Sequence, residues 1–455
     1  MDSSLMSLPP SSPSSQQWDV VVAGGGPAGC TAAISAARQG RRVLLIERTC
    51  SLGGMGTSAL VPAWCPFSDQ QRIIFGGLAS EVFQLSKEGT PHVPAEQMDW
   101  VAIDAEHLKR VYDSLVTEAG VTVLFDTFIV GAEVEGRTVK SLTIANKQGL
   151  SKIDARIFID TSGDADVVAF AGGAFEKGEP VTGNMQPVTI CFVLANVNEE
   201  AYRRMPDARK SIDGQPSLMD QMMAKYPLIP DTHFCNNIVG PGCVGFNAGH
   251  IYEIDNTDPA AVSRAIMAGR QLAAAYRDAL KELQSEAFGN CHLVQTGSLV
   301  GARETRRITG DYTLTVEDYL SRRTFEDEIC RNAYFIDIHL TREEAAKNKD
   351  WEEAINRFKR YGPGESHGIP YRCLIPVSFD NVLVAGRSIS TDRIVQGSVR
   401  VMPVCLAMGE AAGTAAALAL AEDTSVREID TDRLRDILRE NGGYLPEYEP
   451  ATSAT

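Results

Sequence analysis

The 455-residue sequence lacks closely paired cysteines. It has ten cysteines, but no two follow a Cys-x-x-Cys spacing, and cysteines and histidines do not cluster at metal-ligand spacing. Secreted proteins held together by disulfides are short and dense in cysteine, unlike this chain. We therefore expect reduced, mostly buried thiols, and no metal site of the zinc or iron–sulfur kind.

Positive charge is scarce as well. The chain has 43 lysines and arginines against 59 aspartates and glutamates, a net charge of -16. Because nucleic acids and acidic membrane surfaces repel such a protein, we expect neither as a partner. Residues 1–17 are rich in serine and proline and lack the apolar core of a signal peptide, which predicts a disordered tail and a cytoplasmic protein. Residues 401–421 raise a membrane-spanning alternative, but Glu410 at their centre favours a helix buried in the protein.

Three glycines near the start have the spacing of a dinucleotide-binding turn. Gly24, Gly26 and Gly29 lie between an apolar run (19–23) and an alanine-rich stretch (30–38), where a strand turns into a helix. This context predicts a tight turn at Gly24, close approach of a pyrophosphate at Gly26, and close helix packing at Gly29. The helix N-terminus would face the anion. The predicted cofactor contacts here also include Pro27 and Ala28.

A second strand and its acidic end complete the pattern. A second strand is predicted at 42–46 and ends at Glu47, about 20 residues beyond the glycines, where a carboxylate accepts hydrogen bonds from ribose hydroxyls. By contrast, Gly240, Gly242 and Gly245 match the same glycine spacing without a following helix. We interpret this second match as a loop or strand edge.

The segment after Glu47 resembles a known cofactor fold. Arg48, four further residues, the doublet Gly53-Gly54 and Met55 are similar to the acid-Arg-x4-Gly-Gly extension of FAD-binding proteins of the glutathione reductase type. Further stretches, in order, resemble the FAD-dependent oxidoreductase family, which includes proteins labelled xanthan-lyase-like and is distantly similar to fumarate reductase flavoproteins. These stretches are 158–173, 301–319, 337–339, 368–390 and 400–417.

The resemblance implies an α/β protein with a Rossmann-like FAD-binding domain of three layers and a parallel sheet, into which an α+β substrate domain is inserted. The boundaries that we predict are a tail at 1–17, FAD-binding parts at 18–174 and 368–425, the substrate domain at 175–367 and a C-terminal extension at 426–455. Helices are predicted at 105–119, 258–283 and 343–360, and a hairpin turns at Gly136.

The resemblance also implies that FAD contacts come from late segments. Gly163 and Asp164 follow the strand that closes the sheet, and Gly386, Arg387, Gly397 and Val401 belong to the return segment NVLVAGRSISTDRIVQGSVRV. Pro403 is well placed at a helix start. The positive end of that helix would point to the pyrimidine edge of the flavin.

Candidates for chemistry are Arg400, His339, Arg306 and Tyr371. Each has a structural alternative: His339 as a hydrogen-bonded core residue on an alternating strand, and Tyr371 as a packing residue. The arginines at 303, 306 and 307 are equally compatible with pairing to Glu304 and Asp311 at a domain junction. Cys65 and Cys405 are weaker candidates for reactive thiols, and Cys65 is the obvious candidate for a covalent flavin link.

The prediction is an FAD-dependent oxidoreductase that transfers a hydride from a small polar substrate, an alcohol, amine or sugar-like molecule, to flavin N5. Oxygen or another acceptor would reoxidise the flavin. Two alternatives stay open: reduction of an activated carbon–carbon double bond, and a non-catalytic flavin-binding scaffold. The sequence also leaves open whether the chain forms a homo-oligomer.

Overall fold

The computed structural model of the chain describes residues 17–347 and 360–448. The predicted tail, apart from Gln17, and most of the predicted helix at 343–360 lie outside these residues. The strands are β1 (Trp18–Ala23), β2 (Val43–Ile46), β3 (Thr122–Leu124), β4 (Phe128–Glu135), β5 (Thr138–Asn146), β6 (Gly149–Asp160), β7 (Phe175–Lys177), β8 (Phe192–Ala195), β9 (Phe234–Gly240), β10 (Cys243–Ala248), β11 (His292–Thr296), β12 (Arg306–Ile308), β13 (Glu328–Asn332), β14 (His367–Pro370) and β15 (Val382–Val384). The helices are α1 (Pro27–Arg38), α2 (Gly77–Lys87), α3 (Ala105–Glu118), α4 (Asp166–Phe170), α5 (Glu199–Arg203), α6 (Leu218–Lys225), α7 (Pro259–Leu283), α8 (Ser285–Phe288), α9 (Val316–Leu320), α10 (Arg342–Lys347), α12 (Arg393–Val399), α13 (Met402–Glu422) and α14 (Thr431–Glu440), with short 3-10 turns η3 (Gly54–Gly56) and η4 (Tyr371–Leu374).

A parallel sheet in the order β3-β2-β1-β6-β15 organises the larger part of the molecule. Its strands are apolar on both faces because both faces are covered. In β1, Val20 and Val22 pack among the helices, whereas Val21 and Ala23 pack in the core on the other side. This burial on two sides is what a continuous apolar run predicts for a parallel strand.

Three layers follow from this arrangement, as predicted. Helices α1 and α13 cover one face, and the antiparallel strands β4, β5 and the first half of β6 form the layer on the other. The turn of the β4–β5 hairpin contains Gly136, at φ +61°. The α/β fold class is therefore confirmed, and α3 confirms the helix predicted at 105–119.

Helix α13 lies in the middle of the body. Among the described residues it is the one helix long and apolar enough to span a membrane, and 89% of its most apolar stretch is buried inside the protein. Its single buried acid, Glu410, accepts a hydrogen bond of 2.8 Å from the backbone N–H of Leu78 in the first turn of α2. Packing against the sheet and neighbouring helices therefore accounts for its apolar composition.

Burial raises the pKa of Glu410 to about 7. The folded protein thus holds a proton here at pH values where the unfolded chain has lost it, so the free energy of unfolding should fall as pH rises from about 4.5 to 7. We expect Glu410→Gln to raise that free energy by about 1 to 3 kcal/mol at pH 8 and to change it little at pH 5. Urea unfolding at both pH values measures this. The same change at exposed Glu118 is the control, and a stabilisation of equal size at the two pH values would contradict the assignment.

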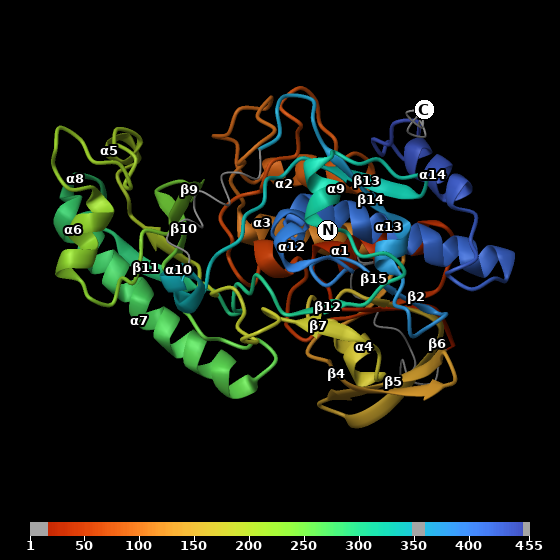
Figure 1. Cartoon of the computed structure of the whole chain (residues 1–455). Helices are drawn as coiled ribbons and strands as arrows, with labels where there is room; N and C mark the ends of the chain where they lie inside the picture. The colour runs from red at the N-terminus through yellow and green to blue at the C-terminus, as the bar shows by residue number, and fades with distance from the viewer. Residues whose placement is uncertain (1–16, 348–359, 449–455) are drawn as a thin grey trace.

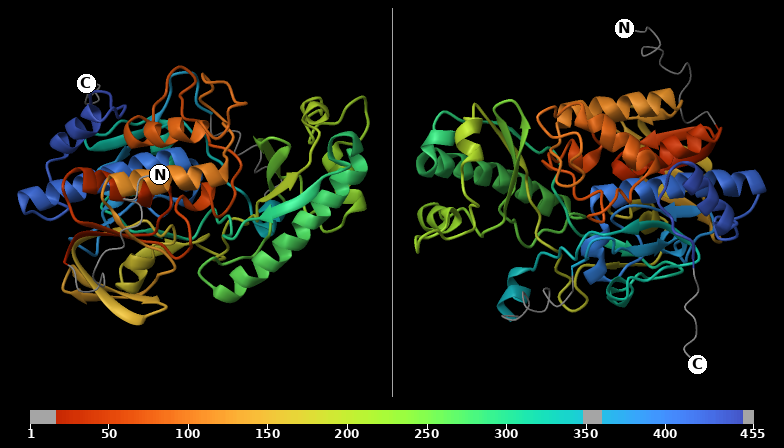
Figure 2. Two further views of the ribbon diagram at one scale, coloured as in Figure 1. Left: turned by 180° about the vertical axis from the view of Figure 1, so that it is seen from behind. Right: turned by 90° about the horizontal axis from the view of Figure 1, so that it is seen from above.

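A separate lobe stands to one side of the body in all three views (Figures 1 and 2). It contains an antiparallel sheet in the order β11-β8-β10-β9, and α7 packs on one face of this sheet through Tyr276, whose ring stacks on Phe192. Helix α7 confirms the helix predicted at 258–283. The second glycine match forms the β9–β10 hairpin, with Gly242 at φ +63° in its turn, which confirms that it is strand-edge punctuation.

The lobe is shorter than the predicted substrate domain at 175–367. Its core residues lie between Phe192 and Cys291. Strand β7 instead pairs with β12, and side chains from Leu314 to Ile375 pack in the main core. The predicted C-terminal extension likewise contributes Leu434 to that core. The chain enters the lobe, leaves it after β11 and returns to the body earlier than composition suggested.

Candidate functional site

A cavity of about 1180 Å³ lies at the carboxyl ends of the parallel strands and extends to the lobe. Ala23, Ile46, Thr161 and Ala385 line it at the ends of β1, β2, β6 and β15 or directly after them. Ligands of open α/β sheets bind at this edge. Pockets for single small molecules reach about 1,000 Å³, so this cavity has room for a large ligand and part of a second one.

The first glycine loop brings the backbone to the cavity. Gly24 has φ +106°, and a Cβ there would lie 2.6 Å from the Thr161 carbonyl oxygen. A Cβ on Gly29 would lie 1.8 Å from the Gly24 carbonyl oxygen, so only glycine allows α1 to pack this closely. Gly26 has open space where a Cβ would stand, and it lines the cavity together with Pro27 and Ala28. The tight turn and the close packing are as predicted, and the contact of Gly26 with a pyrophosphate stays a prediction.

Glu47 and Arg48 also line the cavity. The Glu47 carboxylate accepts hydrogen bonds from the backbone N–H groups of Gly25, at 2.7 Å, and Thr49, at 2.8 Å. The acid therefore orders the glycine loop, and its remaining lone pairs are available to ribose hydroxyls, as predicted contacts. Arg48 is exposed and forms no hydrogen bond or ion pair with the part of the chain that the structure describes.

The late segment meets the first one through backbone contact of α13 with α1. A Cβ on Gly409 would lie 2.1 Å from the Ala28 carbonyl oxygen, and one on Gly413 would lie 2.2 Å from that of Ala32. Thr31 Oγ1 donates to the Leu406 carbonyl at 2.7 Å. Glycine at both positions lets the two helices lie side by side, so both N-termini reach the same cavity. The N-cap residue of α1 is Gly26 and that of α13 is Val401, and neither has a side-chain cap, which leaves N–H groups for a ligand.

Arg387, which follows β15, is hydrogen-bonded to the loop that follows β6. It donates to the Gly163 carbonyl at 2.8 Å, to Asp164 at 2.6 Å and to the Ala302 carbonyl at 2.6 Å. Gly163, Arg387 and Gly386 line the cavity, whereas Asp164 lies behind it and holds Arg387. The role of Asp164 is therefore to position Arg387 beside the loop at Gly163.

Four further predicted cofactor residues divide in the same way. Gly54 and Met55 line the cavity. Gly53 does not, because its N–H donates to the Gly25 carbonyl at 2.8 Å and shapes the loop. Gly397 does not either, since it packs against the backbone of Asp337, where a Cβ would lie 3.1 Å from the carbonyl oxygen.

A cluster of three histidines stands where the cavity passes from the body to the lobe. His339 Nδ1 lies 2.8 Å from His250 Nε2, and His250 Nδ1 lies 3.0 Å from Asp231. At the other end, His339 Nε2 lies 3.3 Å from Asp337. These four groups form a chain from the cavity wall, where Asp337 and His339 stand, to the partly exposed Asp231. The histidine that completes the cluster, His233, stacks on His250 at 4.4 Å.

The pKa values of the histidines and aspartates in this cluster are shifted far from their ordinary values. Burial, together with Arg303, lowers the pKa of His339 to about 3 against the pull of Asp337, so the ring is neutral at neutral pH. Burial alone would raise the pKa of Asp337, but His339, Arg400 and Arg303 bring it below its usual range. Burial would also raise the pKa of Asp231, but the hydrogen bond with His250 brings it below its usual range. Two carboxylates therefore flank two neutral rings.

The three ring nitrogens lie within 4.8 Å of one another, which is close enough to test for a metal. The rings of His233 and His250 are stacked 10° from parallel, so their in-plane lone pairs do not converge. Arg303 Nη2 also lies 3.1 Å from His233 Nε2, which places a cation where a metal would stand. This geometry suits proton transfer better than metal binding.

The other catalytic candidates separate clearly. Arg400 lines the cavity and donates to the carbonyl of Asp337 at 2.7 Å, and its buried Nε has no hydrogen-bond partner among the described residues. Arg306 does not line the cavity; it pairs at 2.8 Å with Asp166, which does. The hydroxyl of fully buried Tyr371 donates to the Val426 carbonyl at 2.8 Å, so it packs. His339 lies on an irregular segment, which corrects its expected place on a strand.

The two candidate thiols line the cavity, but they are poor nucleophiles. Burial raises the pKa of Cys65 and of Cys405 to about 12. Only a minute fraction of either is thiolate at neutral pH, and the thiolate is the reactive form.

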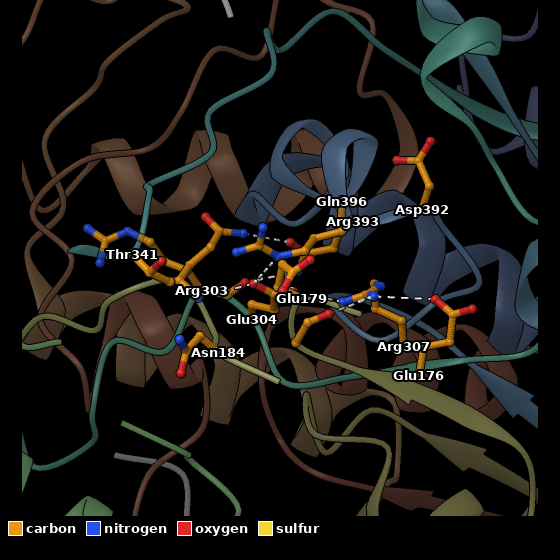
Figure 3. A network of polar contacts seen from close by, with 12 residues as sticks. Glu176, Glu179, Asn184, Arg303, Glu304, Arg307, Thr341, Asp392, Arg393 and Gln396 are labelled. Carbon is orange, nitrogen blue, oxygen red and sulfur yellow. Dashed lines mark hydrogen bonds and ion pairs between the residues drawn. The ribbon is translucent and has the colours of Figure 1, made fainter. Parts of the chain in front are cut away.

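A buried ion-pair network supports the site from behind (Figure 3). The Glu304 carboxylate lies between Arg307, at 2.8 Å, and Arg393, at 3.0 Å. It also accepts the backbone N–H of Gln186 at 3.0 Å, and the Gln186 side chain accepts the N–H of His339 at 3.0 Å. The predicted pairing of Arg307 with Glu304 is therefore present, whereas Asp311 pairs with Arg427.

Removing the centre of this network should be costly. Glu304→Ala leaves Arg307, with 2% of its side chain exposed, and Arg393, with 10%, without their shared carboxylate. We expect the free energy of unfolding to fall by about 3 to 5 kcal/mol, as for other broken buried pairs. Urea unfolding measures this, with Glu133→Ala at the exposed Glu133–Lys152 pair as the control that should change little. Equal effects of the two changes would contradict the role of burial.

The sequence analysis missed His233, His250, Asp231 and Asp337 as members of the site. The signal available was weak: His250 ends the second glycine match, and Asp337 precedes His339 by two positions. Because these residues come from segments separated by about ninety positions, only the fold brings them together.

The geometry between α1 and α13 fits FAD on its own observations. Gly26 leaves an open cradle, and the uncapped N-termini of α1 and α13 face the cavity. These features suit a pyrophosphate and a flavin ring that becomes negative on reduction.

Comparison with known proteins agrees that the protein binds FAD. Residues 19–438 match the family described as FAD dependent oxidoreductase. A curated relative, the tRNA uridine 5-carboxymethylaminomethyl modification enzyme MnmG of Chlorobium phaeovibrioides (strain DSM 265 / 1930), is 28% identical over 213 residues, which are 43% of this chain and 33% of the relative. The match thus spans about a third of that relative's length.

Solved structures align over most of the chain at low similarity. A myxobacterial chondrochloren halogenase covers 94% of this chain and 79% of its own, with 14% identity and a TM-score of 0.46. A geranylgeranyl bacteriochlorophyll reductase-like protein of Thermoplasma acidophilum covers 93% and 83%, with 12% identity and a TM-score of 0.42. These scores are too low to support any conclusion. The family match extends over nearly the whole chain, and on that ground the chain belongs to the FAD dependent oxidoreductase family and is an enzyme that uses FAD.

Proposed function

We propose that this enzyme oxidises a hydroxyl group of a small polar substrate by removing a hydride and a proton, and that an amine is handled in the same way. FAD, when bound, supplies the two-electron acceptor at N5. The observation that carries the proposal is the chain from Asp337 through His339 and His250 to Asp231, which begins at the cavity wall. Oxidation of a hydroxyl group releases a proton, and these four linked side chains can carry that proton from the cavity to Asp231.

The hydrogen bonds among these four side chains leave one ring nitrogen that can accept a further proton. Neutral His250 donates from Nδ1 to Asp231, and neutral His339 donates from Nδ1 to His250 Nε2. That leaves His339 Nε2 without a proton while it faces the Asp337 carboxylate at 3.3 Å. One added proton completes every hydrogen bond of the chain. Because the pKa of His339 is lowered, the ring is neutral at neutral pH and its Nε2 is open to a proton, which it holds only weakly and passes on toward His250; double-bond reduction would instead need a proton donor.

Two arginines suit a negatively charged substrate group. Arg303 and Arg400 both line the cavity, and Arg400 Nε is a free buried donor among the described residues. A carboxylate beside the reacting hydroxyl would accept hydrogen bonds there. The 2-hydroxy acids are therefore the first substrates to test.

Anaerobic mixing tests the proposal. The FAD-loaded enzyme is combined in turn with 2-hydroxy acids, sugars and amines, and the oxidised flavin absorption is followed. Bleaching by a saturated substrate is expected. Failure of all saturated compounds, together with reoxidation of the photoreduced enzyme by an enoate, would overturn the proposed direction.

We further propose that the partners are small molecules only and that the enzyme acts in the cytoplasm. The relative is named for tRNA modification, but the net charge of -16 argues against a polyanionic substrate for this chain.

A further inference from the structure

The cavity does not end at the histidines. It continues past the edge strand β9 into the lobe, where its walls include Tyr202, Met205, Ala208, Phe246, Leu280 and Phe288. These residues come from α5, from the segment after it, from β10 and from the adjoining helices α7 and α8. We call this lobe end of the cavity the apolar chamber.

The walls of the apolar chamber also belong to the lobe core. Tyr202 and Met205 are partly exposed to this space and Ala208 is 8% exposed, whereas Phe246, Leu280 and Phe288 are at most 1% exposed and border it with only a small part of their surface. Protein interiors are normally packed as densely as organic crystals, and unfilled apolar volume costs stability. The partly exposed apolar side chains beside the lobe core therefore offer a surface that a hydrocarbon group of a ligand would cover.

The polar groups at the apolar chamber are already engaged. The Tyr202 hydroxyl donates to Asn236, and Asn247 lies 3.3 Å from His233. At the rim, Arg209 pairs with Asp207 at 3.2 Å. The apolar chamber therefore offers hydrocarbon surface, whereas the histidine end of the same cavity offers charge.

We propose that the apolar chamber binds the hydrocarbon body of the enzyme's own substrate, which is amphipathic. Its polar group lies at Arg303 and Arg400, and its apolar body extends past His233 into the lobe. Continuity with the reaction cavity identifies the occupant, and the placement of the polar group rests on the proposed function.

A chain-length series tests this without any turnover. The oxidised, FAD-loaded enzyme is titrated with straight-chain carboxylates from acetate to decanoate, and binding is read from the change in flavin absorption. Each methylene that enters the apolar chamber should tighten binding by about fourfold. Because these carboxylates cannot be oxidised as hydroxyl compounds, the result does not depend on the direction of the reaction.

Ala208→Phe should fill the apolar chamber and abolish the chain-length dependence while acetate still binds. Met205→Trp makes the same test from another wall, should the first variant fold poorly. Ala260→Phe, on the exposed start of α7, is the matched control and should keep the native series. Affinities that do not rise with chain length in the native enzyme, including no binding throughout, would overturn the proposal. So would an undiminished series in both filled variants.

Discussion

Gly26→Ala should produce a folded protein that has lost most of its affinity for FAD. The backbone at Gly26 has φ -70° and ψ -175°, which alanine adopts without strain, and a Cβ there meets nothing within 4 Å. The new methyl group therefore stands in the open cradle, where a pyrophosphate would approach. We expect a 10- to 100-fold weaker affinity, the cost of overpacking by about 1 to 3 kcal/mol.

Two glycine-to-alanine changes make this result specific. Gly131→Ala, on β4, meets the Thr143 side chain at an ordinary 3.5 Å and should leave both stability and FAD binding unchanged. Gly29→Ala forces a Cβ to 1.8 Å from a carbonyl and should destabilise the fold itself. Flavin fluorescence titration and thermal unfolding of the apoprotein separate the two effects. Native FAD affinity in Gly26→Ala would show that the pyrophosphate does not lie at this turn.

Much of the FAD side of the site follows from local sequence, for a physical reason. A strand, a positive-φ turn and a helix start are set by residues a few positions apart, so Gly24 and Gly29 could be assigned from spacing. Glu410 at the centre of an apolar run likewise indicated that the helix at 401–421 is buried in the protein. What the spacing did not show is that Gly409 and Gly413 make α13 the direct neighbour of α1.

The catalytic side depends on contacts that no local pattern encodes. Asp231 and His250 lie on loops of the lobe, and Asp337 lies on an irregular segment of the body. Their meeting depends on how the lobe packs over the sheet ends. The lobe boundary was missed for a related reason: buried residues from Leu314 to Ile375 join the body core, and only the fold shows which core an apolar residue joins.

Asp337→Asn should slow flavin reduction by substrate by about 10²- to 10⁴-fold, the usual contribution of a positioned acid–base group. Asparagine keeps the volume and can still accept from Arg400 and Tyr334. It removes the negative charge that faces His339 Nε2, and with it the stabilisation of the added proton. FAD binding should be unchanged, so the loss appears in the rate of bleaching after anaerobic mixing.

A change at Asp231, at the outer end of the four linked side chains, should slow flavin reduction less than a change at Asp337. The order of these rates tests the proton path more sharply than either variant alone. Asp231→Asn leaves Asp337 and His339 in place at the cavity and removes only the last acceptor, so we expect a slowing of about tenfold. Asp255→Asn, at the partly exposed pair with Lys177, makes the same chemical change at a residue that neither lines the cavity nor belongs to the chain of histidines, and it should have no effect. A chain that passes a proton outward requires the order Asp337, then Asp231, then Asp255. Equal rates in all three variants would leave the chain without a part in the reaction.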